Sequence, residues 1–167
     1  MKTSVLNTAP SAVIAATFLF APMATATFAG QMAGNTVQFN TAQIDGLNIA
    51  YREAGDPANP TVLLLHGFPT SSHMFRNLIP ELAGNYHVIA PDYPGFGASD
   101  MPDAAEYEYS FANTAAIMTE LLDQKNVDDY AVYLMDYGAP VGFRMFAEHP
   151  ERVSGFIIQN GNAYEEG

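Results

Sequence analysis

Short apolar runs recur along the chain and predict the strands of a buried sheet. Two early segments, residues 36–41 and 47–55, alternate apolar and polar positions and predict an antiparallel hairpin. Four later runs are almost continuously apolar, which is typical of strands covered on both faces; they span residues 61–67, 86–92, 130–136 and 153–161. The pattern therefore predicts an N-terminal hairpin followed by four buried strands.

The segment after the first buried strand predicts a helix with an irregularity. Residues 71–84 place apolar side chains at helical spacing, with Ser71 or Ser72 as the N-cap and Gly84 as the end. Pro80 lies inside this pattern and should kink or shorten the helix, because proline lacks a backbone N–H.

Two further helices are predicted between the remaining buried strands. One follows the cap residue Ser110, and the other covers residues 139–149 with Pro140 in its first turn. Apolar strands that alternate with helices indicate an α/β fold, with a mostly parallel sheet covered by helices on both faces and led by the antiparallel hairpin.

Ligands of such sheets bind beyond the carboxyl ends of the strands. Three of these ends carry polar or glycine-rich sequence: residues 66–69 (HGFP), 92–97 (DYPGFG) and 136–139 (DYGA). The Gly-x-Gly spacing of Gly95 and Gly97 does not indicate a dinucleotide site, because no third glycine opens a helix.

Asp136 lies where the third buried strand turns directly into a helix. Gly138 and Ala139 follow it and are small enough for the strand and helix backbones to pass close together. Such a corner strains the backbone and presents its side chain at the top of the sheet, beside the N–H groups of the helix, where a carboxylate can act as a nucleophile. The simpler alternative is that Asp136 only caps the helix.

A second strand end supplies a possible partner for this corner. The backbone N–H of Phe68, in the sequence His66-Gly67-Phe68-Pro69, should point toward the same space as that of Tyr137. Two such donors would form an oxyanion hole. The alternative is an ordinary turn at the end of a strand.

Taken in order, these pieces resemble the N-terminal half of an α/β-hydrolase-fold protein. The matching segments are residues 63–83, 86–100 and 133–157, and the resemblance covers about residues 36–160. An aspartate at the corner is the pattern of the epoxide hydrolase and haloalkane dehalogenase branches, and His66-Gly67-Phe68-Pro69 matches the HGxP form of epoxide hydrolases. The resemblance implies that Asp136 forms a covalent alkyl-enzyme ester with a small hydrophobic substrate, without a cofactor or a metal.

Two departures weaken the resemblance to haloalkane dehalogenases, which usually place Trp directly after the nucleophile to bind the halide. This chain has Tyr137 there and contains no Trp, and Phe68 stands where dehalogenases often have Asn. Carbon–halogen hydrolysis is therefore the runner-up, and ester hydrolysis is more distant. Leu134 replaces a small residue common two positions before the nucleophile, which predicts different packing beneath the corner.

Release of an alkyl-enzyme ester needs a general base, and in the family that base is a His near the end of the domain. None of His66, His73, His87 and His149 has the expected position after a strand downstream of Asp136. We therefore expect this sequence to be a fragment of a hydrolase that cannot turn over by itself. The alternative is a non-catalytic binding remnant, with its last strand left as an open sheet edge.

Composition restricts the possible partners. The chain has 6 Lys and Arg against 18 Asp and Glu, a net charge of -12, which disfavours binding to nucleic acid. Without cysteine it has no disulfide and no thiol nucleophile.

The N-terminal segment has the pattern of an export signal. Residues 11–23 form an apolar block that is short for a membrane span, and small residues at Ala24 and Ala26 suit signal peptidase. We expect residues 1–26 to be a signal peptide and 27–35 a lead-in, with residues 36–167 forming the hydrolase part of an exported protein that is not integral to the membrane.

Overall fold

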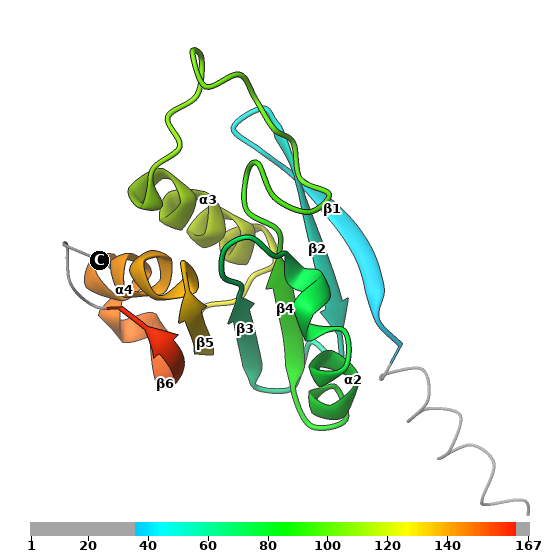
Figure 1. Ribbon diagram of the computed structural model, residues 1–167. Helices are drawn as coiled ribbons and strands as arrows, with labels where there is room; N and C mark the ends of the chain where they lie inside the picture. The colour runs from blue at the N-terminus through cyan, green and yellow to red at the C-terminus, as the bar shows by residue number, and fades with distance from the viewer. Residues whose placement is uncertain (1–35, 163–167) are drawn as a thin grey trace, which may run out of the picture.

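The computed structural model describes residues 36–162, which form a mixed six-stranded sheet flanked by helices (Figure 1). The predicted signal peptide and lead-in lie outside the described residues, so both stay predictions. The elements are β1 Gln38–Ile44, β2 Leu47–Ala54, β3 Thr61–Leu65, η1 Ser72–Phe75, α2 Leu78–Leu82, β4 His87–Pro91, α3 Phe111–Gln124, β5 Tyr130–Asp136, α4 Gly138–Glu148, η2 Pro150–Arg152 and β6 Val153–Gly161.

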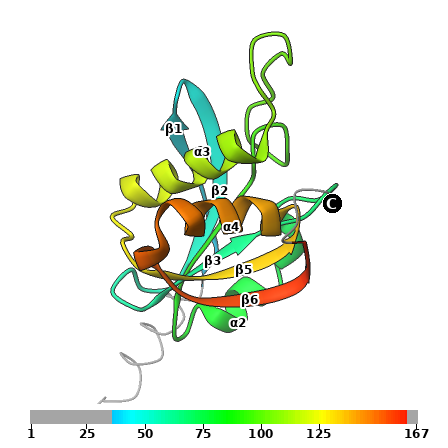
Figure 2. The ribbon, with the colours of Figure 1, turned by 90° about the vertical axis from the view of Figure 1, so that its left-hand side faces the viewer.

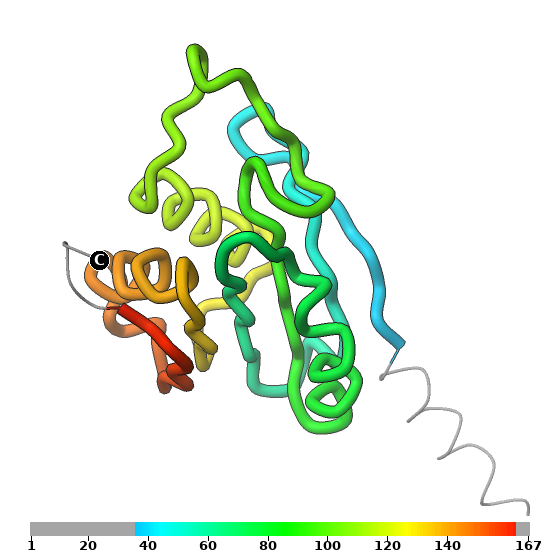
Figure 3. Tube along the Cα trace, in the orientation of Figure 1, coloured from blue at the N-terminus to red at the C-terminus, as the bar shows by residue number. Residues whose placement is uncertain are grey.

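The strand order is β1-β2-β4-β3-β5-β6. β1 and β2 form the predicted antiparallel hairpin, and β2 joins it to β4, also antiparallel. β4, β3, β5 and β6 run parallel to one another. The tube in Figure 3 follows this path from the hairpin to β6 at the opposite edge. The prediction of an α/β fold led by a hairpin is therefore confirmed.

Helices cover the two faces of the sheet unequally. Figure 2 shows α3 and α4 on one face and α2 on the other. Successive side chains of a strand point to opposite faces, so β3 contributes Leu63 and Leu65 to the larger core cluster, which includes α3 and α4, and Val62 and Leu64 to the smaller one beneath η1 and α2. All residues of β3 and β4 are buried, as their apolar runs predict. The same prediction is wrong for β6, whose residues are mostly exposed because it is an edge strand of the sheet.

The helix predicted over residues 71–84 is two short helices instead of one. Ser71 caps η1 as expected, since its side chain accepts a hydrogen bond from the His73 N–H at 3.3 Å. The two helices are separated at residues 76–77. Pro80, inside α2, explains the break, because a proline has no N–H to donate and its ring does not tolerate a helical carbonyl four residues earlier, at Arg76.

The other two helices begin where the sequence predicts. Ser110 caps α3 by accepting a hydrogen bond from the Asn113 N–H at 3.2 Å, and Pro140 lies in the first turn of α4. No helix within residues 36–162 is long and apolar enough to cross a membrane.

Candidate active site

The chain turns from β5 into α4 over a single residue. β5 ends at Asp136 and α4 begins at Gly138. Asp136 has a φ of 50°, in the left-handed region that is costly for a residue with a side chain. A Cβ on Gly138 would lie 2.5 Å from the Leu65 carbonyl oxygen, so only glycine fits there. This is the sharp, strained corner that the sequence predicts.

The Asp136 carboxylate is held by two backbone donors. The N–H of Phe68 donates to Asp136 Oδ1 at 2.8 Å, and the N–H of Tyr137 donates to the same oxygen at 2.7 Å. Asp136 is exposed, and its Oδ2 has no hydrogen bond within the described part of the chain. The two N–H groups predicted to form an oxyanion hole thus converge on one point.

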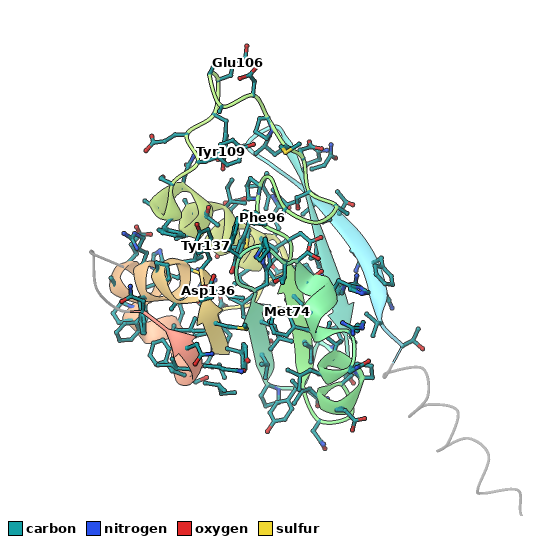
Figure 4. All side chains as sticks on the ribbon, viewed as in Figure 1. Met74, Phe96, Glu106, Tyr109, Asp136 and Tyr137 are labelled. Carbon is teal, nitrogen blue, oxygen red and sulfur yellow. The ribbon has the colours of Figure 1, made fainter. Side chains whose placement is uncertain are left out.

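The simpler capping role considered for Asp136 is not observed. The N-cap residue of α4 is Tyr137, and the helix start has no side-chain capping hydrogen bond. Figure 4 places Asp136 at the carboxyl end of β5 and Tyr137 beside it. The carboxylate therefore connects the corner to the loop after β3 and does not satisfy the N–H groups further along α4.

Gly67 allows that loop to reach Asp136. A Cβ on Gly67 would lie 2.6 Å from the Asp136 Cβ, closer than any real contact of this kind. The Gly67 carbonyl accepts hydrogen bonds from the N–H and the hydroxyl of Thr70, at 3.0 and 2.8 Å, and the Phe68–Pro69 peptide is cis. The HGFP sequence is therefore a tight turn that presents the Phe68 N–H to the carboxylate.

His66 supports this turn from below and does not face the solvent. Its Nδ1 lies 3.0 Å from the Gly67 carbonyl, and its Nε2 accepts a hydrogen bond from the Tyr93 N–H at 3.3 Å. These partners assign a neutral ring protonated at Nδ1. Burial lowers the pKa of His66, which favours the same neutral form.

Tyr93 is a component of the site that the sequence interpretation missed. Its ring stacks on His66 with centroids 4.0 Å apart, and its hydroxyl donates to the His66 carbonyl at 2.9 Å. Burial and the nearby Asp136 charge raise the pKa of Tyr93 well above its ordinary value, so the phenol stays protonated. Its position directly after the buried strand β4 was the available signal.

The loop after β4 is organised by a buried carboxylate. Asp92 accepts hydrogen bonds from the N–H groups of Ser72 at 2.7 Å and Ala98 at 2.9 Å. A Cβ on Gly97 would lie 2.1 Å from Asp92 Oδ2, and Gly97 has a φ of 56°. The glycines of this loop therefore shape a turn, in keeping with the rejection of a dinucleotide site.

Leu134 lies beneath the corner and packs against α4. It is fully buried, and a Cβ on Gly142 would lie 2.2 Å from its Cδ2 atom. The missing side chain of Gly142 on α4 provides the volume that the larger Leu134 on β5 occupies.

Aromatic rings surround the open side of the corner. The Tyr137 ring lies between Phe68 and Phe111, with centroid distances of 5.4 and 5.0 Å, and Phe68 also contacts Phe96. Figure 4 shows Phe96 and Tyr137 close together above Asp136. The environment of the carboxylate is thus apolar and aromatic, which suits an uncharged organic group.

The four histidines are engaged away from the carboxylate. His66 is held as described above, His73 lies next to Arg52, His87 bonds Glu53, and His149 pairs with Glu151. Within residues 36–162, no group of three or more His, Cys, Asp or Glu side chains is arranged to hold a metal ion.

Comparison with known proteins gives a consistent family. The family model described as "alpha/beta hydrolase fold" matches residues 60–167. An uncharacterized hydrolase of Saccharomyces cerevisiae is 52% identical over 137 residues, covering 81% of this chain and 47% of the relative.

Two solved structures share the fold at moderate identity. A haloalkane dehalogenase from Bradyrhizobium elkani is 33% identical with a TM-score of 0.71, and covers 75% of this chain and 42% of its own. An epoxide hydrolase is 31% identical with a TM-score of 0.68, and covers 74% and 42%. The chain spans less than half the length of the curated relatives that it matches. The sharp corner between β5 and α4, called the elbow below, the strand order and these matches agree. The chain belongs to the α/β hydrolase fold family.

Proposed function

We propose that Asp136 is the nucleophile of a hydrolase that opens small apolar epoxides through a covalent alkyl-enzyme ester. The observation that carries this proposal is the convergence of the Phe68 and Tyr137 N–H groups on Asp136 Oδ1, which leaves Oδ2 free. Aspartate side chains are ordinarily ionised at neutral pH, so attack by Oδ2 needs no base.

The first half-reaction needs no protein group other than Asp136. Asp136 Oδ2 forms a bond to an epoxide carbon while the bond from that carbon to the ring oxygen breaks, and the ring oxygen takes the electron pair and then a proton from water. In the second half-reaction, water gives a proton to a general base and adds to the carboxyl carbon of the ester, and the bond from that carbon to Oδ2 then breaks to release the diol. As the water adds, the charge develops on Oδ1, where two N–H donors are already placed.

The second half-reaction needs a general base, and the described histidines are engaged elsewhere. We expect a longer form of the protein, of the length of its relatives, to provide this base. The 167-residue chain should therefore react once and then stop.

Intact-mass spectrometry tests this chemistry. After incubation with styrene oxide, the chain should gain the mass of one epoxide, and Asp136→Asn should not. Asp129→Asn, a change at an exposed acid just before the opposite end of β5, serves as the matched control and should react normally. An unchanged adduct in Asp136→Asn, or sustained turnover by the wild-type chain, would contradict the proposal.

Carbon–halogen hydrolysis is the second candidate, because a solved haloalkane dehalogenase is 33% identical to this chain. Against it stands Tyr137, where dehalogenases usually carry a halide-binding Trp. Parallel incubations with styrene oxide and 1-bromohexane separate the two: faster alkylation by the epoxide supports the first proposal, and faster alkylation with bromide release supports the second.

Export is proposed separately, from the apolar N-terminal block and the small residues at Ala24 and Ala26. Expression of the full chain in a bacterial host, followed by N-terminal sequencing of the periplasmic fraction, should give a protein that begins after Ala26. Retention of Met1 in a cytoplasmic protein would refute export.

A further inference from the structure

A pocket of about 480 Å³ lies beside the elbow, between the loop after β4 and the helices α3 and α4. Aromatic side chains dominate its wall, and Tyr137 belongs both to this wall and to the ring cluster around the carboxylate. The polar residues of its lining are Tyr93, Tyr109, Ser110, Thr114, Tyr137 and Arg144. The Tyr137 side chain therefore connects this pocket with the surroundings of Asp136.

Most hydroxyl groups of the pocket already have partners within the protein. The hydroxyl of Tyr93 donates to His66, that of Tyr109 donates to Pro102, and that of Thr114 donates to Ser110. The Ser110 hydroxyl caps α3. Two polar side chains remain for a ligand: the Tyr137 hydroxyl and the Arg144 guanidinium.

The Arg144 guanidinium reaches back toward the elbow. Side chains of a helix tilt toward its N-terminus, and Arg144 Nη1 donates to the Pro140 carbonyl at 2.9 Å, one turn nearer to Asp136. The guanidinium carbon also lies 5.7 Å from the centre of the Phe111 ring. Tyr137, Val141 and Arg144 follow one another at helical spacing and form one wall of the pocket.

Arg144 is a half-buried cation without an acidic partner in residues 36–162. Lys125 pairs with Glu53 and Arg152 pairs with Asp123, whereas Arg144, like Arg52 and Arg76, makes no ion pair within that range. Of these three arginines, Arg144 is the one in the wall of the pocket beside the elbow. Figure 4 shows Glu106 at the tip of its loop, well away from Asp136 and Tyr137.

We propose that this pocket binds the far end of the substrate, and that this end carries a carboxylate which pairs with Arg144. The aromatic wall would hold the apolar body of the same molecule. An arginine fork matches a carboxylate in shape, and the Tyr137 hydroxyl can donate a further hydrogen bond. The substrate class is thus a small epoxide whose apolar aryl or alkyl body ends in a carboxylate. This inference rests on the proposed role of Asp136 for the reacting end only.

Binding of an unreactive pair of compounds tests the pocket without any chemistry at Asp136. We would titrate the full chain with 4-phenylbutyrate and with the neutral 4-phenylbutyramide, by calorimetry at low salt. The wild type and Asp136→Asn should both bind the carboxylate about tenfold more tightly than the amide, since a charge-assisted hydrogen bond has about this strength. If the wild type is not alkylated by styrene oxide but still prefers the carboxylate, the nucleophile proposal fails and this one stands.

Three variants identify the responsible group. Arg144→Gln should abolish the preference, Arg144→Lys should keep part of it, and Arg76→Gln, a change at an exposed arginine of the opposite face, should keep all of it. Near-ultraviolet circular dichroism checks that each variant is folded. If Arg144→Gln does not fold, Arg144→Lys still tests the role of the guanidinium. Equal affinity for carboxylate and amide in the wild type, binding of neither compound, or an unchanged preference in Arg144→Gln would overturn the inference.

Discussion

Gly67 and Asp136 pack directly against each other, across the boundary between the loop after β3 and the end of β5. A Cβ on Gly67 would lie 2.6 Å from the Asp136 Cβ and 3.0 Å from its Oδ1. The hydrogen bond from the Phe68 N–H to the carboxylate therefore depends on the absence of a side chain at residue 67.

Gly67→Ala should misplace the carboxylate. The added methyl group must push Asp136 away from the Phe68 N–H, and a displacement of about 1 Å costs roughly a hundredfold in the rate of a positioned reaction. We expect the rate of adduct formation with styrene oxide to fall by that order, as measured by intact-mass spectrometry. Gly155→Ala in β6 is the control, because nothing lies within 4 Å of its added Cβ. Equal rates for the wild type and Gly67→Ala would contradict the geometry.

Leu134 and Gly142 should be energetically coupled. Gly142→Ala drives a methyl group into Leu134 and should destabilise the fold by about 1–3 kcal/mol. Leu134→Ala alone leaves a cavity and should cost about 2–5 kcal/mol. The double variant should be more stable than the sum of the two costs implies, because each change relieves the other. Urea unfolding of the four proteins measures the coupling, and strict additivity would show that the two residues do not share this space.

Glu53 should make stability fall in acid. It accepts hydrogen bonds from His87 at 2.8 Å, Lys125 at 3.0 Å and the Asn40 amide at 3.0 Å. Burial alone would raise the pKa of Glu53, but His87 and Lys125 outweigh it, and the pKa lies below its ordinary value of 4.5. The stabilisation is therefore present above pH 4.5 and is lost as the pH falls through the folded-state pKa.

Glu53→Gln isolates this contribution. It should lower the free energy of unfolding at pH 7 by about 1–3 kcal/mol, since it removes a charged acceptor from three donors. Urea unfolding at about pH 5 and pH 3 gives the free energy of unfolding of each protein at the two pH values. The variant should lose less of it than the wild type as the pH falls. Glu81→Gln, at an exposed position of α2, should behave like the wild type.

His66 should add a second pH dependence at a higher pH. Burial lowers its pKa below the ordinary 6.5, so the unfolded chain binds a proton at His66 before the folded chain does. Its contribution is full above pH 6.5 and is lost as the pH falls toward the folded-state pKa. In His66→Gln the loss of stability between about pH 6.5 and pH 5 should shrink, as measured by urea unfolding at these pH values. An identical pH profile for His66→Gln would refute this account.

The sequence predicts the framework well because the signals are local. The apolar runs at β3, β5 and β6 and the glycine after Asp136 are contiguous in the chain, and the positions of the strands follow from them. Burial does not follow in the same way, because the apolar run cannot show that β6 lies at the edge of the sheet. The corner was predictable for the same reason. The break between η1 and α2 was foreseen only in part: Pro80 signals a distortion, but the surrounding packing decides where the helix divides.

What could not be predicted depends on contacts between distant residues. Leu134 departs from the small residue that the family usually has two positions before the nucleophile. The space it occupies is explained only by Gly142, which faces it from α4. Tyr93 and His66 lie 27 residues apart, and nothing in either segment indicates that their rings stack. In the sequence, Arg144 cannot be told from an ordinary surface cation. The pocket that it lines is built from three segments that are separate in the chain.

The two N–H groups on Oδ1 make the carboxylate oxygens of Asp136 chemically distinct. Under the proposed mechanism, Oδ2 bonds to the substrate carbon and leaves with it when the ester is hydrolysed. The first molecule of product would then carry an oxygen atom that belonged to the protein, and the protein would take its replacement from water. In water enriched in oxygen-18, the isotope would therefore appear in Asp136 before it appears at the newly formed alcohol.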